Sequence, residues 1–434
     1  MSGPLVLGRL DAAALARLNA GAPDALRRAR ERAFAEAAAL PLPTMRDEEW
    51  RRTDPGRFPF EFVRPPDPVP RADGPLWSTP EHEFFDVVVT VSEEGIGVAD
   101  RSGVLRSGAA VVERIEDRAQ RAPEDIAAGY RGPAMAAAIG APLVPDPIEA
   151  LIGAFAASGI WIEVRARAAL ERGVLIHHRW RRPESLAAWR TLARVGPGAS
   201  LGLSEWIEGG GSGGILASSR ELYAAEGARV RVLALQEAAD DAAVLSVDAA
   251  RVERDGEIDT LVAPLGAGAL RTKTVVDLAG TGAHARMGGI GLFTGGRHAD
   301  QKTVQIHSAA DTTSDLLYRA IVRDTARSVF QGVIVARRGA QRIDAYQRNN
   351  HLLLNDGARA DSLPGLLIDA DDLKCTHGST IGHLDRDALF YLRARGLSER
   401  AARRLLLEAF GDVLLARCPQ PALRERMRAA LAAA

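Results

Sequence analysis

The sequence predicts a mainly β fold in which a β-solenoid core lies between two helical regions. Short segments of alternating apolar and polar residues, separated by glycines, fill the chain from about residue 148 to 384. A run of strong helix formers precedes this stretch, and a segment with apolar residues at helical spacing follows it. With 434 residues, 47% hydrophobic and 26% charged, the composition is typical of a soluble globular protein with room for two or three domains.

The N-terminal region, residues 1–147, is predicted to be mainly helical with Pro-rich linkers. Strong helix formers run from Ala25 to Leu40, and the prolines that follow end the helix. The stretch VRPPDPVPRADGP at 63–75 is typical of an extended linker. A second Pro-rich break, APLVPDP at 141–147, closes the region.

Residues 148–384 are predicted to form the β core, because segments such as GVLIHHRW, GASLGLSEW and GARVRVLAL alternate with period 2. Gly-Ala pairs recur there without a fixed period, which favours a degenerate solenoid over a propeller. These pairs begin at Gly198, Gly227, Gly282, Gly339 and Gly357. We expect the inner face to carry Val, Leu, Ile and Ala, and the turns to carry Gly, Asp and Asn. A β-sandwich is the second choice, since no Cys–Trp–Cys pattern is present.

Residues 385–434 are predicted to be helical and to offer a docking surface. One helix is expected from near Asp385 to Gly396, Ser398 is a suitable N-cap for the next, and a last helix is expected over 422–433. The middle helix has apolar residues at i, i+3 and i+4 spacing: Ala402, Leu405, Leu406, Ala409, Phe410, Val413 and Leu414. Its many arginines raise the alternative of a helix-turn-helix DNA binder, but acidic neighbours dilute the positive charge. A helix that docks on a protein partner is favoured.

The N-terminus and the charge indicate the compartment and exclude some partners. No basic segment followed by an apolar core opens the chain, so a secretory signal is not expected. The longest apolar run, Leu151–Ile162, is too short to span a bilayer. A net charge of −1 gives no general reason to expect nucleic acid or a membrane as partner. The two cysteines, Cys375 and Cys418, cannot form a disulfide framework, and a cytoplasmic location is expected.

The candidate site is the pair Cys375 and His377, in the stretch DLKCTHGSTIGHLD at 372–385. On a strand the two side chains share a face, where a thiolate and an imidazole can bind a soft metal or part of an iron–sulfur cluster. Such a site needs about four ligands, so the others must come from another chain. Two alternatives stay open: an inert buried cysteine beside an unrelated histidine, and a Cys/His nucleophile oriented by Asn355 or Asp369.

Two further motifs are interpreted as structural. The glycine tract EGGGSGG at 208–214 lacks lysine, and the chain holds no phosphate-binding loop motif, so a flexible turn is expected. His177 and His178 are adjacent on a strand, where alternation sends their rings to opposite faces. They cannot chelate one metal together, and we interpret them as ordinary strand residues.

Several linked blocks resemble the SufB/SufD family of iron–sulfur cluster assembly proteins. The blocks from Gln301 onward are HSAADTTSDLLYRAI, RSVFQGVI, QRNNHLLLNDGARADSLPGLLI and KCTHGSTIG. Earlier, DEEWRRTD resembles the N-terminal motif of the family, and AFAASGIWIEVRARAALERGVLIHH resembles the start of its β-helix. The resemblance covers nearly the whole chain. The order Cys375-Thr376-His377-Gly378 lacks the glutamates of SufB-like chains and is most similar to the SufD-like branch.

The resemblance implies a right-handed parallel β-helix and a non-catalytic scaffold subunit of the SufBCD complex. His377 would face a SufB cysteine at the β-helix interface where the nascent cluster forms, and Cys375 corresponds to a neighbouring family cysteine. The chain alone would hold no cofactor stably, because the iron–sulfur cluster is transient and shared with SufB. The helices at roughly 385–416 would dock on SufC, the subunit that uses ATP. The expected docking residues are Tyr391, Leu405, Leu406 and Phe410.

Two other functions remain possible. Two copies of the Cys375/His377 pair would supply four ligands, so a homodimer could act as a SufB-like scaffold or cluster carrier. A β-helix enzyme acting on polysaccharide is the second alternative. It would need a cleft of charged groups and usually a secretion signal, and the aromatic residues that stack on sugars are few.

Overall fold

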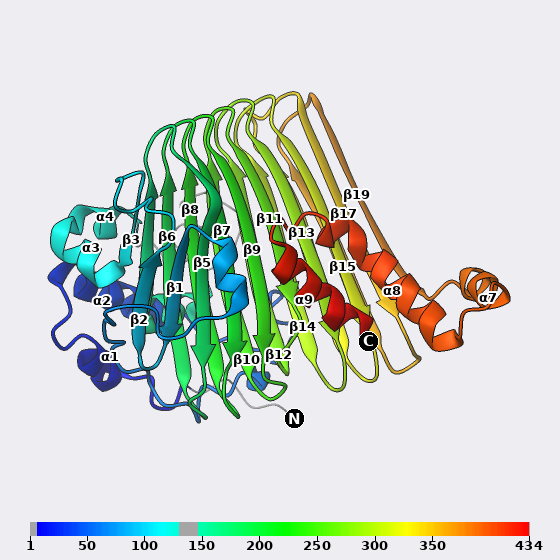
Figure 1. The fold of residues 1–434 in the computed structure, drawn as a ribbon, viewed down its shortest axis with the longest axis horizontal. Helices are drawn as coiled ribbons and strands as arrows, with labels where there is room; N and C mark the ends of the chain where they lie inside the picture. The colour runs from blue at the N-terminus through cyan, green and yellow to red at the C-terminus, as the bar shows by residue number, and fades with distance from the viewer. Residues whose placement is uncertain (1–6, 130–145, 434) are drawn as a thin grey trace.

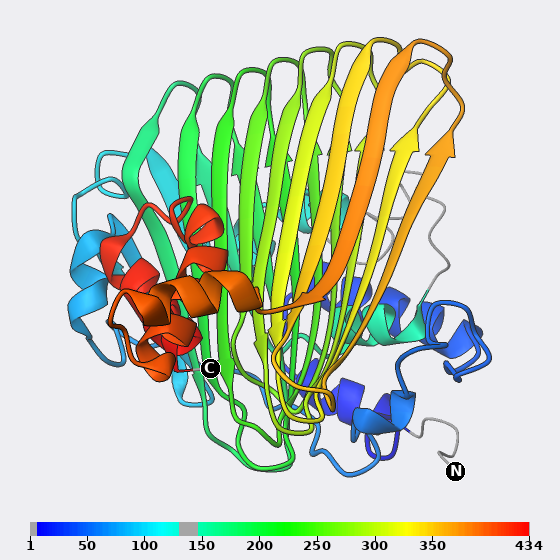
Figure 2. The same cartoon turned by 90° about the vertical axis from the view of Figure 1, so that its right-hand side faces the viewer.

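The computed structural model describes residues 7–129 and 146–433, which form a β-solenoid of about eight turns with helices on its outside (Figure 1). Two sheets face each other along the solenoid, and successive core strands alternate between them. Figure 2 turns the C-terminal end of the solenoid, with its last strands in orange, toward the viewer. The predicted fold class, a mainly β protein with a solenoid core and flanking helices, is confirmed.

Each sheet of the described residues is a continuous ladder along the solenoid. The first sheet has ten strands, in the spatial order β2 (Gly95–Asp100), β1 (Val87–Ser92), β5 (Ala169–Trp180), β7 (Ser200–Gly209), β9 (Arg229–Ala238), β11 (Glu257–Pro264), β13 (His284–Phe293), β15 (Thr313–Val322), β17 (Ile343–Leu353) and β19 (Leu373–His383). The second has nine, in the order β3 (Ala110–Arg114), β4 (Ser158–Val164), β6 (Leu186–Val195), β8 (Ile215–Ala224), β10 (Ala243–Val252), β12 (Ala269–Leu278), β14 (His298–His307), β16 (Arg327–Ala336) and β18 (Arg359–Ile368).

The core strands pair in parallel, because each turn of the chain places a strand on the equivalent strand of the turn before. The β1–β2 and β3–β4 pairs at the N-terminal end are antiparallel. Gly198, Gly227 and Gly282 open turns with φ of +62°, +63° and +76°, the left-handed region that favours glycine. Gly-Ala pairs in the sequence therefore mark places where the chain reverses between sheets.

The inner face, the side of each strand that faces the other sheet, is largely apolar. Val232, Leu270 and Leu316 belong to one continuous buried cluster, as the alternation predicted. Buried polar residues lie on this face as well: Glu205 and Arg220 in earlier turns, and Gln347 and Asn349 in the last turns. The expectation of a purely aliphatic inner stripe is therefore wrong. In QRNNH, both alternating sets of β17 are polar, so the pattern does not indicate which set points inward.

The N-terminal region contains helices, as predicted. It also contains three strands that the sequence analysis did not predict. The helices are α1 (Ala12–Leu18), α2 (Asp24–Ala39), η1 (Pro55–Arg57), η2 (Pro80–Phe84), α3 (Ile115–Arg121), α4 (Pro123–Gly129) and α6 (Pro147–Phe155). Strands β1, β2 and β3 extend the two sheets, and β1 pairs directly with β5. In VVVTVS of β1 every residue is buried, so alternation could not reveal a strand. Positions 141–145 of the second Pro-rich break lie outside the described residues.

Three helices follow the solenoid: α7 (Arg386–Ala394), α8 (Glu399–Leu415) and α9 (Pro421–Ala432). The expected N-cap Ser398 is confirmed, since it accepts the N–H of Ala401 at 3.2 Å. The helix expected from near Asp385 is also present, and Asp385 caps it by accepting the N–H of Ala388 at 3.1 Å. Helices α8 and α9 cover the outer face of the first sheet, whereas α7 projects away from it (Figure 1). None of the helices in the described part of the chain has the length and hydropathy needed to cross a bilayer.

Candidate functional site

Cys375 and His377 lie on β19, the last strand of the first sheet. With β18, the last strand of the second sheet, it forms the terminal turn of the solenoid. Among the described residues, β19 pairs only with β17 and β18 only with β16. The outer edges of both strands therefore present backbone N–H and C=O groups to another strand. The candidate site is thus at an open end of the solenoid.

The register with β17 shows where the two side chains point. Cys375 pairs with Ala345 and His377 pairs with Gln347. Ala345 and Gln347 are buried between the sheets, so Cys375 and His377 share the inner face of the terminal turn, as predicted from strand alternation. Cys375 is half-buried against the cluster that contains Ala345, whereas His377 is exposed. The structure therefore brings the two candidate residues together on one surface.

The surroundings do not favour Cys375 as a nucleophile. Burial raises the pKa of the Cys375 thiol, and thiolate is the nucleophilic form. Asn355, a candidate orienting residue, is engaged elsewhere. Its Nδ2 donates to the carbonyl oxygen of Asp324 at 2.8 Å, and its Oδ1 accepts the Asp324 N–H at 2.6 Å. Asn355 therefore links two successive turns of the solenoid and does not orient His377.

The pair supplies part of a ligand set. Within residues 7–129 and 146–433, no three His, Cys, Asp or Glu side chains come together so that they could hold a metal ion. Cys418 is buried beneath α8 and α9, where its Sγ donates to the carbonyl oxygen of Gln420 at 3.4 Å. Burial raises the pKa of Cys418 to about 11, as expected of an inert structural thiol. The chain therefore offers two ligands, Cys375 and His377, at an open end of the sheet, whereas an iron–sulfur cluster takes about four.

Exposed apolar side chains also lie on the terminal turn. Leu367 and Ile368 of β18 and Ile381 of β19 are 46%, 42% and 48% exposed. Ile368 and Ile381 lie at inner-face positions, which the next turn would cover if the solenoid continued. These two side chains are therefore left exposed at the end of the solenoid, where nothing in the described part of the chain covers them.

The C-terminal helices divide the four predicted docking residues into two groups. Tyr391 of α7 is 57% exposed and Leu405 of α8 is 44% exposed. Leu406 and Phe410 are half-buried, and the guanidinium of Arg319 lies 5.0 Å from the Phe410 ring centroid. Phe410 thus anchors α8 to the sheet, because it sits on the helix face that turns to β15. Helical spacing alone could not show which of the four residues are exposed and which are half-buried.

Two exposed apolar residues of this region are not among the four predicted docking residues, although Val413 belongs to the apolar positions named for the middle helix. Phe390, next to Tyr391 on α7, is 74% exposed, and Val413 of α8 is 56% exposed. No residue of α7 is buried, so its aromatic side chains contribute nothing to the core. The sequence feature that could have identified Phe390 is its position next to Tyr391 in a short, arginine-rich helix.

His177 and His178 point to opposite faces of β5, as predicted, and each joins a buried network. The His178 Nε2 lies 3.0 Å from Glu205 Oε1 on the inner face. On the outer face, His177 Nε2 lies 2.9 Å from Glu208 and its ring stacks on Trp206. Burial would raise the pKa of Glu208, but hydrogen bonds from His177 and Arg179 lower it to about 2. Both histidines therefore have structural partners.

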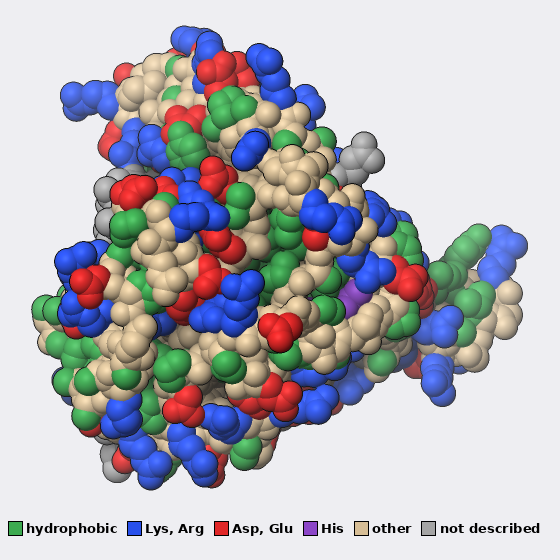
Figure 3. Space-filling model, turned by 60° about the vertical axis from the view of Figure 1, so that its left-hand side comes forward, with side chains coloured by type: hydrophobic (Ala, Val, Ile, Leu, Met, Phe, Trp, Pro, Cys, Tyr) green, Lys and Arg blue, Asp and Glu red, His purple; other side chains and the backbone are tan. Residues whose placement is uncertain are grey.

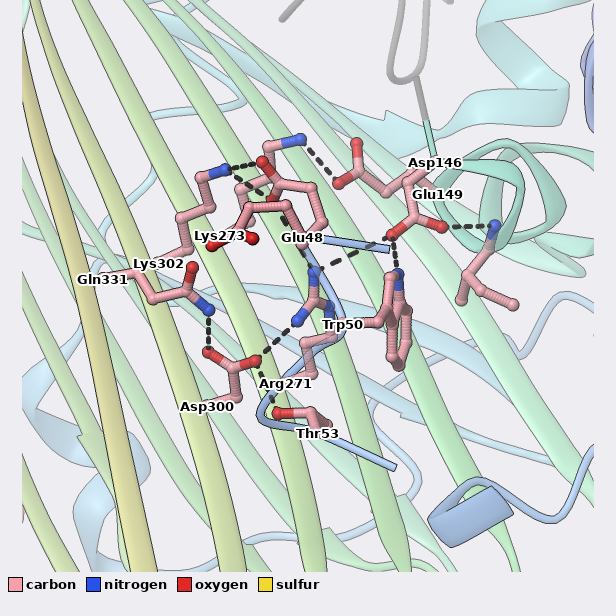
Figure 4. A network of polar contacts seen from close by, with 12 residues as sticks. Glu48, Trp50, Thr53, Asp146, Glu149, Arg271, Lys273, Asp300, Lys302 and Gln331 are labelled. Atoms are coloured by element: carbon pink, nitrogen blue, oxygen red, sulfur yellow. Dashed lines mark hydrogen bonds and ion pairs between the residues drawn. The ribbon is translucent and has the colours of Figure 1, made fainter. Parts of the chain in front are cut away.

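The DEEWRRTD segment binds the outer face of the second sheet through charged and polar contacts (Figure 4). Lys302 of β14 forms an ion pair with Glu49. Asp300 accepts hydrogen bonds from Thr53 Oγ1 and Arg271 Nη1, each at 2.6 Å. The Trp50 indole donates to Asp146, just before α6, at 3.0 Å. The motif thus ties the N-terminal segment and α6 to the core.

Comparisons with known proteins identify relatives of the solenoid. The family model "SUF system FeS cluster assembly, SufBD core domain" matches residues 178–410. An iron–sulfur cluster assembly SufBD family protein of Mycobacterium bovis is 32% identical over 227 residues, which are 50% of this chain and 57% of that protein. The chain therefore spans less than two thirds of the length of this relative.

Two similar proteins carry the name iron–sulfur cluster assembly protein SufD. The protein of Escherichia coli is 33% identical over 165 residues, which cover 38% of this chain and 39% of that protein. The protein of Bacillus subtilis is 29% identical over 157 residues, 36% of each chain.

Proposed function

This chain belongs to the SufBD core family of the SUF system for iron–sulfur cluster assembly, and we propose that it acts there as a non-catalytic, SufD-like scaffold subunit. It pairs with SufB through the terminal turn of its solenoid and docks on the ATPase SufC through its C-terminal helices. The observation that carries the proposal is the Cys375–His377 pair, half of a ligand set, at the unpaired edge of a parallel solenoid.

Pairing with SufB is supported by the shape and chemistry of the terminal turn. Its edge strands β18 and β19 offer backbone hydrogen-bonding groups, and exposed Ile368 and Ile381 offer apolar surface on the inner face. A second parallel solenoid meets both needs, because its own edge strands continue the ladders. Such a contact satisfies the edges and covers the apolar side chains at the same time.

The iron–sulfur cluster is the cargo of this interface. His377 presents an exposed imidazole and Cys375 a thiol on the same face, so each can contribute one ligand. The remaining ligands come from SufB, and the chain alone holds no cluster stably. Loss of the thiol proton accompanies binding of a metal by Cys375, since the thiolate is the ligand form.

Docking on SufC is supported by α7 and the exposed side of α8. Phe390, Tyr391 and Leu405 are exposed in a region where α7 has no buried residue. SufC uses ATP, and its movement is transmitted through these helices to the terminal turn. The face drawn in Figure 3 mixes positive and negative side chains over its surface, which suits protein partners better than nucleic acid or an anionic membrane. We place the complex in the cytoplasm.

A homodimer of this chain is the second candidate, because the same open end can meet a second copy. Two Cys375/His377 pairs would then supply four ligands. Light scattering with and without SufB distinguishes the two: a monomer at high concentration that forms a complex with SufB excludes the homodimer.

Anaerobic cluster reconstitution on the co-purified SufBCD complex tests the site. We expect His377→Ala to leave the complex intact and to abolish most of the cluster absorbance. His383→Ala is the matched control, because His383 is another exposed histidine on β19. An unchanged cluster yield in His377→Ala would show that this chain supports SufB and SufC without a ligand of its own.

A further inference from the structure

The inner face of the last three turns is lined by uncharged polar side chains. These turns consist of β14 with β15, β16 with β17, and β18 with β19 (Figure 2). Their inner-face positions include Gln301, Thr303, Gln305, His307, Ser314, Ser328, Gln347, Asn349, His351, Ser362, His377 and Ser379. Earlier turns hold Val, Leu, Ile and Ala at these positions together with a buried charged group, Glu205, Arg220 and Asp248. In the last three turns the polar side chains are uncharged, and they extend to the open end that carries His377.

Three buried amides on this face have one satisfied end and one unsatisfied end. Gln347 Nε2 donates to the carbonyl oxygen of Gly332 at 3.3 Å, and Asn349 Nδ2 donates to that of Tyr318 at 3.4 Å. Gln305 Nε2 donates to Ser314 at 2.7 Å. The carbonyl partners of Gln347 and Asn349 fix the orientation of these amides, since only the NH₂ end can donate. All three amide oxygens have no hydrogen-bond partner among the described residues.

Four more polar atoms of the same inner face share this condition. Among the described residues, they too have no hydrogen-bond partner: Gln301 Nε2, Thr303 Oγ1, His351 Nδ1 and Ser362 Oγ. A buried polar group without a hydrogen-bond partner is unfavourable, so native proteins rarely keep several together. Seven such atoms on three adjacent turns therefore require a partner that supplies hydrogen bonds along the whole row.

The absence of charge among these inner-face side chains indicates what kind of partner they bind. Among the described residues, the inner face of these turns carries no Asp, Glu, Lys or Arg. His307 and His351 are neutral, because burial lowers the pKa of each to about 4. The row therefore offers an ion neither a counter-charge nor a charged ligand. A small neutral molecule that donates and accepts hydrogen bonds fits, and water meets this description.

We propose that the last three turns of the solenoid enclose an ordered chain of water molecules, which opens at the terminal turn beside His377 and Cys375. The unpartnered oxygens of Gln305, Gln347 and Asn349 hold it. Gln347 links it to the candidate site, because it is the register partner of His377 on the same face.

The water chain is tested on the full chain by a high-resolution crystal structure and by ¹⁷O magnetic relaxation, which counts long-lived buried waters. We expect ordered waters within hydrogen-bond distance of the three amide oxygens. Asn349→Leu should reduce the count of buried waters, and Asn350→Leu should not. Asn350 is the matched control, since it follows Asn349 on the outer face and donates to Thr380. Side chains that bond directly to one another without water, or an unchanged count in Asn349→Leu, would overturn the proposal.

Discussion

Gln347 and His377 are register partners on adjacent parallel strands, yet Gln347 is 1% exposed and His377 is exposed. The difference arises because His377 lies on the terminal turn, which no further strand of the described residues covers. A partner that pairs with β19 would give His377 the surroundings that Gln347 already has.

We therefore expect SufB to protect His377 from chemical modification. In the isolated chain, diethyl pyrocarbonate should modify exposed His377 and spare His351, which is 3% exposed. Addition of SufB should protect His377, and mass spectrometry of peptides measures both effects. If His377 reacts equally in the complex, the interface lies elsewhere on the molecule.

Removal of Glu205 should strongly destabilise the fold. Glu205 is buried and accepts hydrogen bonds from Arg220 and from the Trp189 indole at 2.9 Å. Glu205→Leu leaves the buried charge of Arg220 without its main partner, which costs about 3–5 kcal/mol. Glu257→Leu is the control, since its pair with Arg229 is exposed and contributes less than about 1 kcal/mol. Urea denaturation measures both, and equal losses would contradict this account.

The same carboxylate predicts sensitivity to acid. Burial alone would raise the pKa of Glu205, but Arg220 and His178 hold it well below the usual range. A pKa lowered by folding stabilises the native state above the unfolded-state pKa of about 4.3, and this stability is lost as the pH falls further. We expect the midpoint of urea denaturation to fall below pH 4 in wild type, and to fall less in Glu205→Leu.

The contribution of Asp248 to stability should depend on pH in the opposite direction. Burial raises the pKa of Asp248, while the Arg220 guanidinium lowers it, and the net shift is upward. Its Oδ1 has no hydrogen-bond partner among the described residues. Folding is therefore disfavoured by ionisation of Asp248, and the penalty is complete above its native-state pKa. We expect Asp248→Asn to raise the melting temperature at pH 7 and to lose this advantage below pH 4. A lower melting temperature at pH 7 would show that the Arg220–Asp248 contact outweighs desolvation.

Gly332→Ala should disturb the terminal turns through Gln347. A Cβ at Gly332 would lie 2.5 Å from Gln347 Oε1, too close for any real contact. We expect a loss of about 1–3 kcal/mol, the usual cost of overpacking a core. Gly378→Ala is the control, since nothing lies within 4 Å of a Cβ there. In the double variant Gly332→Ala/Gln347→Ala the loss should be smaller than the sum of the two single losses, and additive losses would locate the strain elsewhere.

Phe390→Ser should weaken binding to SufC and leave the stability of the chain unchanged. Phe390 is 74% exposed on a helix without buried residues, so its replacement removes no core contact. Leu407→Ala is the contrasting variant, because Leu407 is 3% exposed and anchors α8, and its loss should cost about 2–5 kcal/mol. Calorimetric titration with SufC and thermal denaturation separate the two effects. Unchanged SufC affinity in Phe390→Ser would remove α7 from the docking surface.

Local patterns were sufficient to predict much of the candidate site. Cys375 and His377 are two residues apart on a strand, so their common face follows from the pleat. Whether that face is covered depends on the number of turns that follow, which is a property of the whole solenoid. The burial of Phe410 also depends on the whole fold. Helical spacing grouped Phe410 with exposed Leu405, but in the structure Phe410 faces Arg319.

The sequence by itself determined the class of fold, because period-2 alternation, Gly-Ala turns and capped amphipathic helices are local features with local physical causes. Only the tertiary structure decided that β1–β3 join the sheets, and for β1 the reason is that a strand buried on both faces shows no alternation. It also decided that Gln347 and Asn349 point inward, because β17 is polar on both of its alternating sets. Where neighbouring residues have the same polarity, register and cover from distant strands decide which of them becomes buried.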